Sequence, residues 1–307
     1  AKVKEATEAI ARGTGVRGLI NIQFAYVSEN LFVIEANPRA SRTVPFVSKA
    51  TGVQLAKAAV MIGLGKSIAE LKAEGYLPKN MDGASLPQNT AIAVKAAVLP
   101  FSRFRTPEGV VVDSLLSPEM RSTGEVMGLD ALYDTAFAKA QAGAGSPLPT
   151  EGKVFVSVAN HDKRNVIIYA KMLEQLGFEI VSTGGTADVL RRNGVNSTVA
   201  SKFAEANGQH SIVDMVRNGE IDLILNTPAG GAARSDGYEI RAAAVSVGCP
   251  VMTTISEFAA AVQAITALRE RSWEIINLQE HGEFLRTAST REQGQDKDEQ
   301  AREGELS

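Results

Sequence analysis

The stretch LFVIEANPRASRTVPFVSK, residues 31–49, places a carboxylate, a carboxamide and two guanidinium groups at the end of an apolar run. A second apolar run, GLINIQFAYV at residues 18–27, precedes it, and Ser28-Glu29-Asn30 separates the two runs. A short polar loop between two strand-like runs predicts a β-hairpin.

We expect this hairpin to have one polar face and one apolar face. If the turn centres on Glu29, Gln23 lies directly opposite Glu35, and directly opposed residues project to the same face of a sheet. Asn37, two residues further on, joins that face because side chains alternate along a strand. The apolar side chains expected to be buried on the other face are Ile20, Ile22, Phe24, Phe32 and Ile34.

The polar face would present one carboxylate and two amide carbonyl groups. Small, hard cations such as Mg²⁺ prefer oxygen ligands of this kind, completed by water and phosphate. Arg39 and Arg42 follow at the strand exit, where their guanidinium groups could hold phosphate oxygens. Each residue taken singly also fits an ordinary solvated hairpin face, but the combination favours a site for a metal ion and phosphate.

The same segment carries a family resemblance. Residues 21–52 closely resemble the metal- and ATP-binding strand pair of an ATP-grasp domain. They are most similar to the second ATP-grasp half of the carbamoyl phosphate synthase large subunits. The resemblance covers about residues 1–285 and includes GKS (65–67), VLPF (98–101) and SPEMRSTGEVMG (117–128).

The resemblance implies ATP-dependent formation of carbamoyl phosphate from bicarbonate and glutamine-derived ammonia, for pyrimidine and arginine biosynthesis. It implies that Gln23, Glu35 and Asn37 bind Mg²⁺ or Mn²⁺ together with ATP. Arg39 and Arg42 would be catalytic and would orient carbamate or the γ-phosphate. A small glutaminase subunit is the implied partner, and assembly into a higher oligomer is a further expectation. We expect the fragment alone to be inactive, because much of the nucleotide-covering part of the grasp would precede it.

The composition is ordinary for a globular chain of 307 residues, with 44% hydrophobic and 22% charged residues. A net charge of −3 provides no basic field, so we expect neither nucleic acid nor membrane as a partner. No run approaches the length of about 18 apolar residues that a membrane span needs. The single cysteine, Cys249, cannot form an internal disulfide and lies among apolar residues, which is typical of a cytoplasmic protein with an inert thiol.

The apolar patterns predict two α/β domains and a tail. Residues 1–128 are expected to form the first domain, which the resemblance identifies as the C-terminal part of an ATP-grasp domain with an antiparallel sheet and helices, and residues 129–152 are expected to be a helix and linker. In residues 153–285 strands alternate with helices, which predicts a doubly wound parallel sheet. The expected strands lie at 154–159, 178–183, 221–227, 250–254 and 274–278. The highly polar residues 286–307 are expected to be a disordered tail.

The second domain contains a candidate phosphate site at STGGTADVL, residues 182–190. A strand ends, two glycines follow and a helix begins, an arrangement that turns backbone N–H groups toward an anion. Loops at the carboxyl ends of parallel strands converge on one edge of the sheet. The side chains expected to meet there and form a phosphomonoester pocket are Lys163, Thr183, Thr186, Lys202 and Asn226.

This half resembles the methylglyoxal-synthase-like fold, which serves in carbamoyl phosphate synthases as an allosteric domain that binds UMP and, in some, IMP. By this resemblance the nucleotide-monophosphate site consists of Lys163, Thr183, Gly185, Thr186, Lys202 and Asn226. Pro228 stands where many relatives have a threonine that helps to bind the nucleotide, which leaves the choice between UMP and IMP open.

The ornithine activator site also departs from the family pattern. Ala96 replaces an expected glutamate and Val251 an expected tyrosine, whereas Thr253 is retained. An amino-acid ammonium group needs an acidic partner, which alanine does not supply. We therefore expect ornithine to activate weakly or not at all.

Two alternative functions remain open at this point. The phosphate pocket also fits a freestanding methylglyoxal-synthase-type lyase, which needs a carboxylate base in the loop at residues 205–212, but this loop has Gln209 in that place. Binding without chemistry is therefore favoured, with His210 as either a ligand contact or a helix-capping or surface residue. His161 and His281 show no metal-ligand spacing. The other alternative is a purely regulatory nucleotide-binding module.

Overall fold

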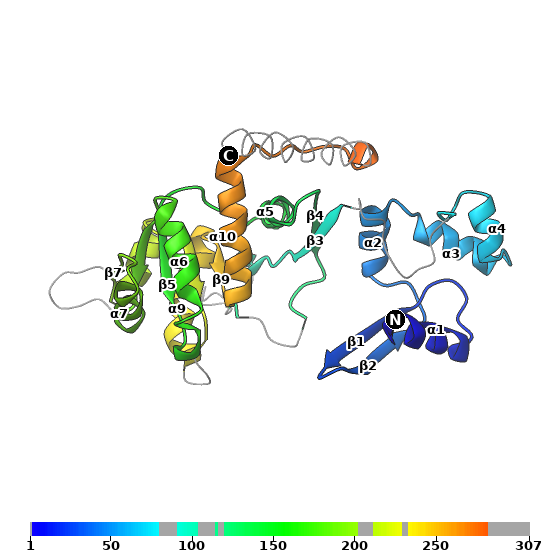
Figure 1. Cartoon of the computed structure of the whole chain (residues 1–307), viewed down its shortest axis with the longest axis horizontal. Coiled ribbons are helices and arrows are strands. Elements are labelled where there is room, and N and C mark those ends of the chain that lie inside the picture. Colours follow the sequence, from blue (N-terminus) through cyan, green and yellow to red (C-terminus); the bar gives the residue numbers. More distant parts are fainter. Residues whose placement is uncertain are drawn as a thin grey trace, which may run out of the picture. The chain divides into compact units, whose positions relative to one another are not determined.

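The computed structural model describes residues 2–79, 91–103, 114–115, 120–201, 211–228 and 233–281. The chain divides into two compact units, one of residues 1–92 with 275–307 and one of residues 93–274 (Figure 1). The domain limits at residues 128 and 153 stay a prediction. Among the helices that the structure describes, none combines the length and the apolar character needed to cross a membrane.

The first unit contains an antiparallel hairpin and short helices. Its elements are α1 (Lys2–Thr14), β1 (Asn21–Val27), β2 (Asn30–Asn37), α2 (Thr43–Thr51), α3 (Leu55–Gly63), α4 (Ile68–Ala73) and η3 (Leu278–Glu280). The buried apolar residues described in this unit are Val53, Ala58 and Leu71. The unit therefore has the expected antiparallel strands and helices, but its described residues form only a small core.

The hairpin turn consists of Ser28 and Glu29, which have positive φ angles of 48° and 65°. Two-residue turns with this backbone conformation match the right-handed twist of the flanking strands. Pairing therefore starts at Val27 and Asn30. A turn centred on Glu29, as expected from the sequence, would instead have paired Ser28 with Asn30.

A β-bulge changes the register further along the hairpin. Phe24 is paired with Val33, whereas the preceding residue Gln23 is paired with Glu35. Ile34 is the extra residue in β2, which is how a bulge opposes two residues on one strand to one on the other. The predicted pairing of Gln23 with Glu35 is confirmed, but it arises from the bulge and not from the expected turn.

The predicted apolar face is partly wrong. Phe32 is paired with Ala25 and so lies on the polar face, because a register change of one residue moves a side chain to the other face. Phe32 is 55% exposed and the bulged Ile34 is 64% exposed, so neither is buried as expected. Ile22 and Phe24 do lie on the opposite face and are partly buried.

The second unit begins with a two-stranded sheet and continues into a parallel sheet. Strands β3 (Ile92–Ala97) and β4 (Glu125–Asp130) pair with each other, and α5 (Tyr133–Gly143) follows. The parallel sheet has the order β7-β6-β5-β8-β9. Its strands are β5 (Lys153–Ser157), β6 (Glu179–Ser182), β7 (Thr198–Val199), β8 (Leu223–Asn226) and β9 (Val251–Met252).

Helices cover both faces of this parallel sheet (Figure 1). The remaining elements are η1 (Phe101–Arg103), η2 (Asn160–Asp162), α6 (Val166–Gln175), α7 (Gly184–Arg192), α8 (Ile212–Arg217), α9 (Ala233–Val247) and α10 (Ile255–Glu270). Val154 and Val156 belong to the core that also includes α6, α7 and α10, whereas Phe155 belongs to the core formed with α8 and α9. This alternation confirms the predicted doubly wound α/β fold.

The prediction of a strand at residues 274–278 is wrong. Residues 272–277 have no regular structure and η3 follows them. Ile275 is 91% exposed, so the apolar run is not in a core. A run of this kind becomes a strand only beside another strand that accepts its backbone hydrogen bonds.

Candidate functional site

The polar face of the hairpin brings the three expected oxygen donors together. Gln23 is paired with Glu35, and Asn37 Nδ2 donates a hydrogen bond of 3.0 Å to Glu35 Oε1. Because the amide nitrogen of Asn37 faces the carboxylate, its carbonyl oxygen remains an acceptor for a cation. Gln23 and Glu35 are exposed, which leaves room for water and phosphate to complete a coordination shell.

This donor set suits a hard, oxygen-seeking cation such as Mg²⁺ or Mn²⁺ better than a metal that prefers nitrogen or sulfur ligands. It contains one carboxylate and two amides, whereas no group of three or more His, Cys, Asp or Glu side chains gathers among the described residues. Hard divalent cations with few protein ligands commonly depend on substrate phosphates for binding. The hairpin therefore fits Mg²⁺ or Mn²⁺ that arrives with a nucleotide.

The two arginines lie where the sequence predicts, between β2 and α2. The backbone N–H of Arg39 donates to the carbonyl of Asn37 at 2.9 Å, and its Nη1 donates to the carbonyl of Ala40 at 3.1 Å. Arg42 immediately precedes α2, and both side chains are exposed. Their expected contacts with phosphate or carbamate stay a prediction.

In the second unit, the glycine turn and Lys163 meet as expected. Thr183 is the N-cap of α7, and Gly184 and Gly185 form the first turn of that helix. The first N–H groups of a helix have no acceptor within it and favour an anion. A Cβ atom added at Gly185 would lie 3.0 Å from Lys163 Nζ, so the ammonium group lies beside this helix end.

A row of hydroxyl groups continues from this turn to the central strand. Thr183 Oγ1 lies 3.4 Å from both Thr186 Oγ1 and Ser157 Oγ. Ser157 ends β5 and is paired with Asn226 at the end of β8. The sequence analysis missed Ser157, although its place at the carboxyl end of the central strand was the available signal.

This position is also a topological switch point. Strands β6 and β7 extend from one side of β5, whereas β8 and β9 extend from the other. Ligands of open α/β sheets bind at the carboxyl ends of strands beside such a point. Thr227 Oγ1 accepts a 2.8 Å hydrogen bond from the N–H of Ala159, which anchors the loop that carries Lys163. Lys202, Gln209 and His210 lie outside the described residues.

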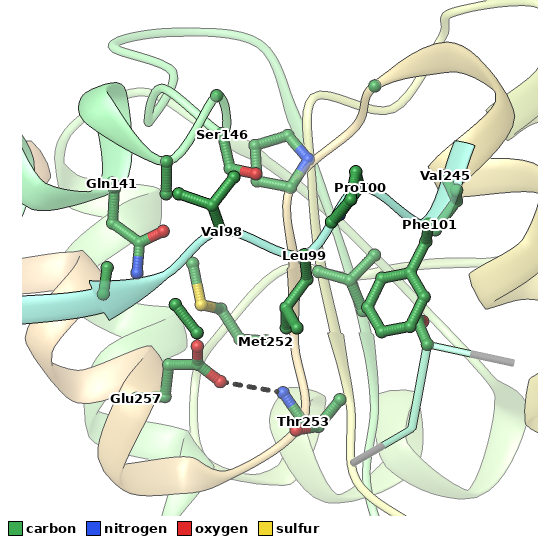
Figure 2. Close-up of a pocket in the computed structure, with 18 of the residues that line it drawn as sticks. Val98, Leu99, Pro100, Phe101, Gln141, Ser146, Val245, Met252, Thr253 and Glu257 are labelled. Carbon is green, nitrogen blue, oxygen red and sulfur yellow. Dashed lines mark hydrogen bonds between the residues drawn. The ribbon is translucent and has the colours of Figure 1, made fainter. Parts of the chain in front are cut away.

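A cavity of about 760 Å³ lies elsewhere in the second unit (Figure 2). Its lining includes Ala96, Val251 and Thr253, the three positions compared with the ornithine site. It also includes Glu257, whose Oε2 accepts a 3.2 Å hydrogen bond from the N–H of Thr253, as the dashed line in Figure 2 shows. Burial raises the pKa of Glu257 above its usual value. Sequence reasoning missed this carboxylate.

The two units of the chain match two different protein families. Residues 1–71 match the family described as the carbamoyl-phosphate synthase L chain ATP-binding domain, and residues 165–253 match the MGS-like domain family. MGS stands for methylglyoxal synthase. The fold and these two matches define a class of protein in which an ATP-binding segment precedes an MGS-like domain.

The relatives are carbamoyl phosphate synthase large chains. That of Kocuria rhizophila is 66% identical over 297 residues, which is 96% of this chain and 27% of the relative. Those of Pseudarthrobacter chlorophenolicus and Streptomyces coelicolor are 66% and 56% identical, each over 92% of this chain and 26% of the relative. Over this shared segment, the chain is similar to the C-terminal quarter or so of carbamoyl phosphate synthase large chains in sequence identity alone, at 56–66%. It spans about a quarter of their length.

Proposed function

We propose that the chain is part of a carbamoyl phosphate synthase, which forms carbamoyl phosphate from bicarbonate, ATP and glutamine-derived ammonia. The observation that carries this proposal is the pairing of Gln23 with Glu35, with Asn37 bonded to the same carboxylate. These three donors lie within the segment that matches an ATP-binding domain.

In this function Gln23, Glu35 and Asn37 hold Mg²⁺ or Mn²⁺ with the phosphates of ATP. The cation, when bound, neutralises charge on the phosphoryl group that is transferred to carbamate. Arg39 and Arg42 orient carbamate or the γ-phosphate through their planar guanidinium groups. The hairpin contributes position and charge, which are the main contributions a protein makes to phosphoryl transfer.

The partner in this function is a small glutaminase subunit that supplies ammonia, and the complete enzyme forms a higher oligomer. The same proposal places the protein in the cytoplasm. A reducing compartment of this kind keeps Cys249 as a free thiol. The enzyme would serve pyrimidine and arginine biosynthesis.

For the second unit we propose a regulatory site for a nucleotide monophosphate, UMP or IMP. The contact of Lys163 with the glycine turn and the hydroxyl groups of Thr183 and Thr186 support a phosphate-binding role. A cavity of about 650 Å³ next to Lys163 is also lined by Arg164 and Arg192, which favour an anionic ligand. Effectors of this kind shift an equilibrium between two states by about 1–3 kcal/mol.

The lyase alternative requires a carboxylate base that this sequence does not provide at the expected position. Gln209 occupies the place where that chemistry needs a carboxylate base, and a carboxamide does not take up a proton. A purely regulatory module would describe the second unit when it acts alone. Binding of nucleotide without turnover of triose phosphate separates the regulatory function from the lyase function.

The test uses the 307-residue chain and the complete enzyme in parallel. Isothermal titration of the chain with UMP and IMP is expected to show binding, with no turnover of triose phosphate. Lys163→Ala and Lys202→Ala should weaken binding at least tenfold, whereas Lys171→Ala, at an exposed position of α6, should not. Carbamoyl phosphate should form only with the complete large chain and its small subunit. Turnover by the 307-residue chain alone would contradict the proposal that it is an incomplete part of the enzyme.

A further inference from the structure

Arg241 of α9 is a fully buried arginine, with 0% of its surface exposed. It lies among apolar residues, with Ile240, Ala243 and Ala244 of the same helix also buried. Burial of a charged group costs free energy unless its N–H groups are hydrogen-bonded. Its Nη1 donates a hydrogen bond of 2.8 Å to Oδ1 of Asn226, which is 6% exposed.

This bond determines which way the Asn226 amide faces. A guanidinium group only donates hydrogen bonds, so the atom that faces Arg241 must be the amide oxygen. The amide nitrogen consequently points away from Arg241. Nδ2 makes one long contact, 3.5 Å, with the carbonyl of Ser157, and the described residues show no further partner for it. An N–H group of Asn226 is therefore available to an acceptor on a ligand.

Gly237 makes room for the same bond. It lies one helical turn before Arg241 in α9. A Cβ atom at this position would overlap Arg241 Nη1 and would lie 2.6 Å from Asn226 Oδ1. Any larger residue at position 237 would therefore push the guanidinium group and the amide apart.

The oriented amide lies at the candidate phosphate site. Asn226 is paired with Ser157, and Ser157 Oγ lies 3.4 Å from the hydroxyl of Thr183 at the N-terminus of α7. The amide and this hydroxyl group thus flank the end of the central strand, where the switch point predicts a ligand.

We propose that Arg241 is a positioning residue for a phosphate-bearing ligand. It holds Asn226 with its oxygen turned inward and its N–H turned to the carboxyl edge of the sheet. The site thereby selects a ligand that presents an acceptor oxygen at this point, such as a nucleotide monophosphate, over one that presents a donor. This inference rests on the proposed nucleotide function of the second unit.

The test is a double-mutant cycle on the 307-residue chain, with UMP, IMP and inorganic phosphate as probes. Asn226→Ala and Arg241→Met should each weaken binding about tenfold. The double variant should bind no more weakly than Asn226→Ala, because Arg241 acts only through that amide. Arg241→Lys keeps a donor for Oδ1 and should recover most of the lost affinity, which a merely structural role would not produce.

The outcomes that overturn the inference are distinct from failure of the proposed function. If wild type binds none of UMP, IMP and phosphate, the nucleotide function itself fails and the inference falls with it. If wild type binds and Arg241→Met binds equally well, or weakens binding to the same degree in the Asn226→Ala background, the inference alone is wrong. Should Arg241→Met not fold, Gly237→Ala decides: it keeps Arg241 but displaces the bond, and unchanged affinity in this variant would refute the role.

Discussion

Gln23 is paired with Glu35 across the hairpin, although the register set by the turn at Ser28 and Glu29 would by itself pair Gln23 with Ile34. The bulge at Ile34 restores the pairing and turns the carboxylate to the face of Gln23. The proposed metal site therefore depends on two local features together: the two-residue turn and the extra residue in β2.

Replacement of Glu35 tests the metal site directly. Glu35→Gln removes the one carboxylate of the donor set, so synthesis of carbamoyl phosphate by the complete enzyme should fall by about 100-fold or more, because a neutral amide neutralises less of the cation's charge. The measurement is the steady-state rate as a function of Mn²⁺ concentration. Glu29→Gln makes the same chemical change in the turn of the same hairpin and should leave the rate unaltered. Equal rates for both variants would rule out the site.

The turn makes a prediction about local stability. Glu29 has a φ of 65°, a conformation that costs a non-glycine residue about 1 kcal/mol or more. Glu29→Gly should therefore stabilise the hairpin and Glu29→Val, with its branched side chain, should destabilise it. Hydrogen exchange of the amides in residues 21–37 measures this directly. Equal protection in the two variants would contradict the turn geometry.

Gly128 of β4 and Gly143 of α5 provide a test position and a control for the packing of β4 against α5. A Cβ atom at Gly128 would overlap the backbone carbonyl of Ala136, whereas one at Gly143 would meet the Val126 side chain at an ordinary 3.5 Å. Gly128→Ala should lower the free energy of unfolding by about 1–3 kcal/mol. Gly143→Ala should be neutral or stabilising because alanine favours helix. Thermal and urea unfolding of both variants provide the comparison, and similar values would be inconsistent with this packing.

The thiol of Cys249 should be unreactive in the folded protein. Burial, and secondarily the charge of Asp222, raises the pKa of this thiol from 9.0 to about 12. At pH 8 roughly one thiol in ten thousand would then be ionised. Iodoacetamide should modify the native chain negligibly and the urea-unfolded chain readily. Rapid modification of the native chain would show that the thiol is not shielded.

The raised pKa of Cys249 also makes the free energy of unfolding depend on pH. The unfolded thiol ionises above pH 9.0 while the folded thiol stays neutral up to about pH 12. The stability contributed by the neutral thiol is therefore present below pH 9 and is lost as the pH rises toward 12. The difference in unfolding free energy between wild type and Cys249→Ser should shrink over this interval, since serine has no such ionisation.

Ornithine should activate the complete enzyme weakly or not at all. Ala96 supplies no carboxylate, and Glu257, the acidic residue described in the cavity lining, has a raised pKa and already accepts a hydrogen bond from Thr253. ATP-dependent synthesis with and without ornithine at pH 7 and pH 8 tests this. Strong activation by ornithine would contradict the prediction. If the Glu257→Gln variant then lost this activation, Glu257 would be identified as the substitute for the missing glutamate.

The sequence predicted much of the second unit because its strands are continuous apolar runs bounded by polar residues. The runs that became β5, β6, β8 and β9 each lie in the parallel sheet. The run at residues 274–278 has the same character but gains no neighbouring strand, and it remains irregular. Strand β4 was missed, since EVMGLD is strand-like only when β3 pairs with it and α5 packs on it.

For the hairpin, the residue types alone were enough to predict two antiparallel strands and the pairing of Gln23 with Glu35, whereas the metal-binding role of these residues stays a prediction. The residue types were not enough to predict that Phe32 shares the polar face, because a single bulge exchanges the two faces of a strand. The orientation of the Asn226 amide could not be predicted from the sequence either. It depends on a guanidinium group fifteen positions later in the chain, which only the packing of α9 against the sheet brings within 2.8 Å. Local patterns specify which groups a chain carries, whereas the direction in which a group points is decided by the long-range contacts that hold it.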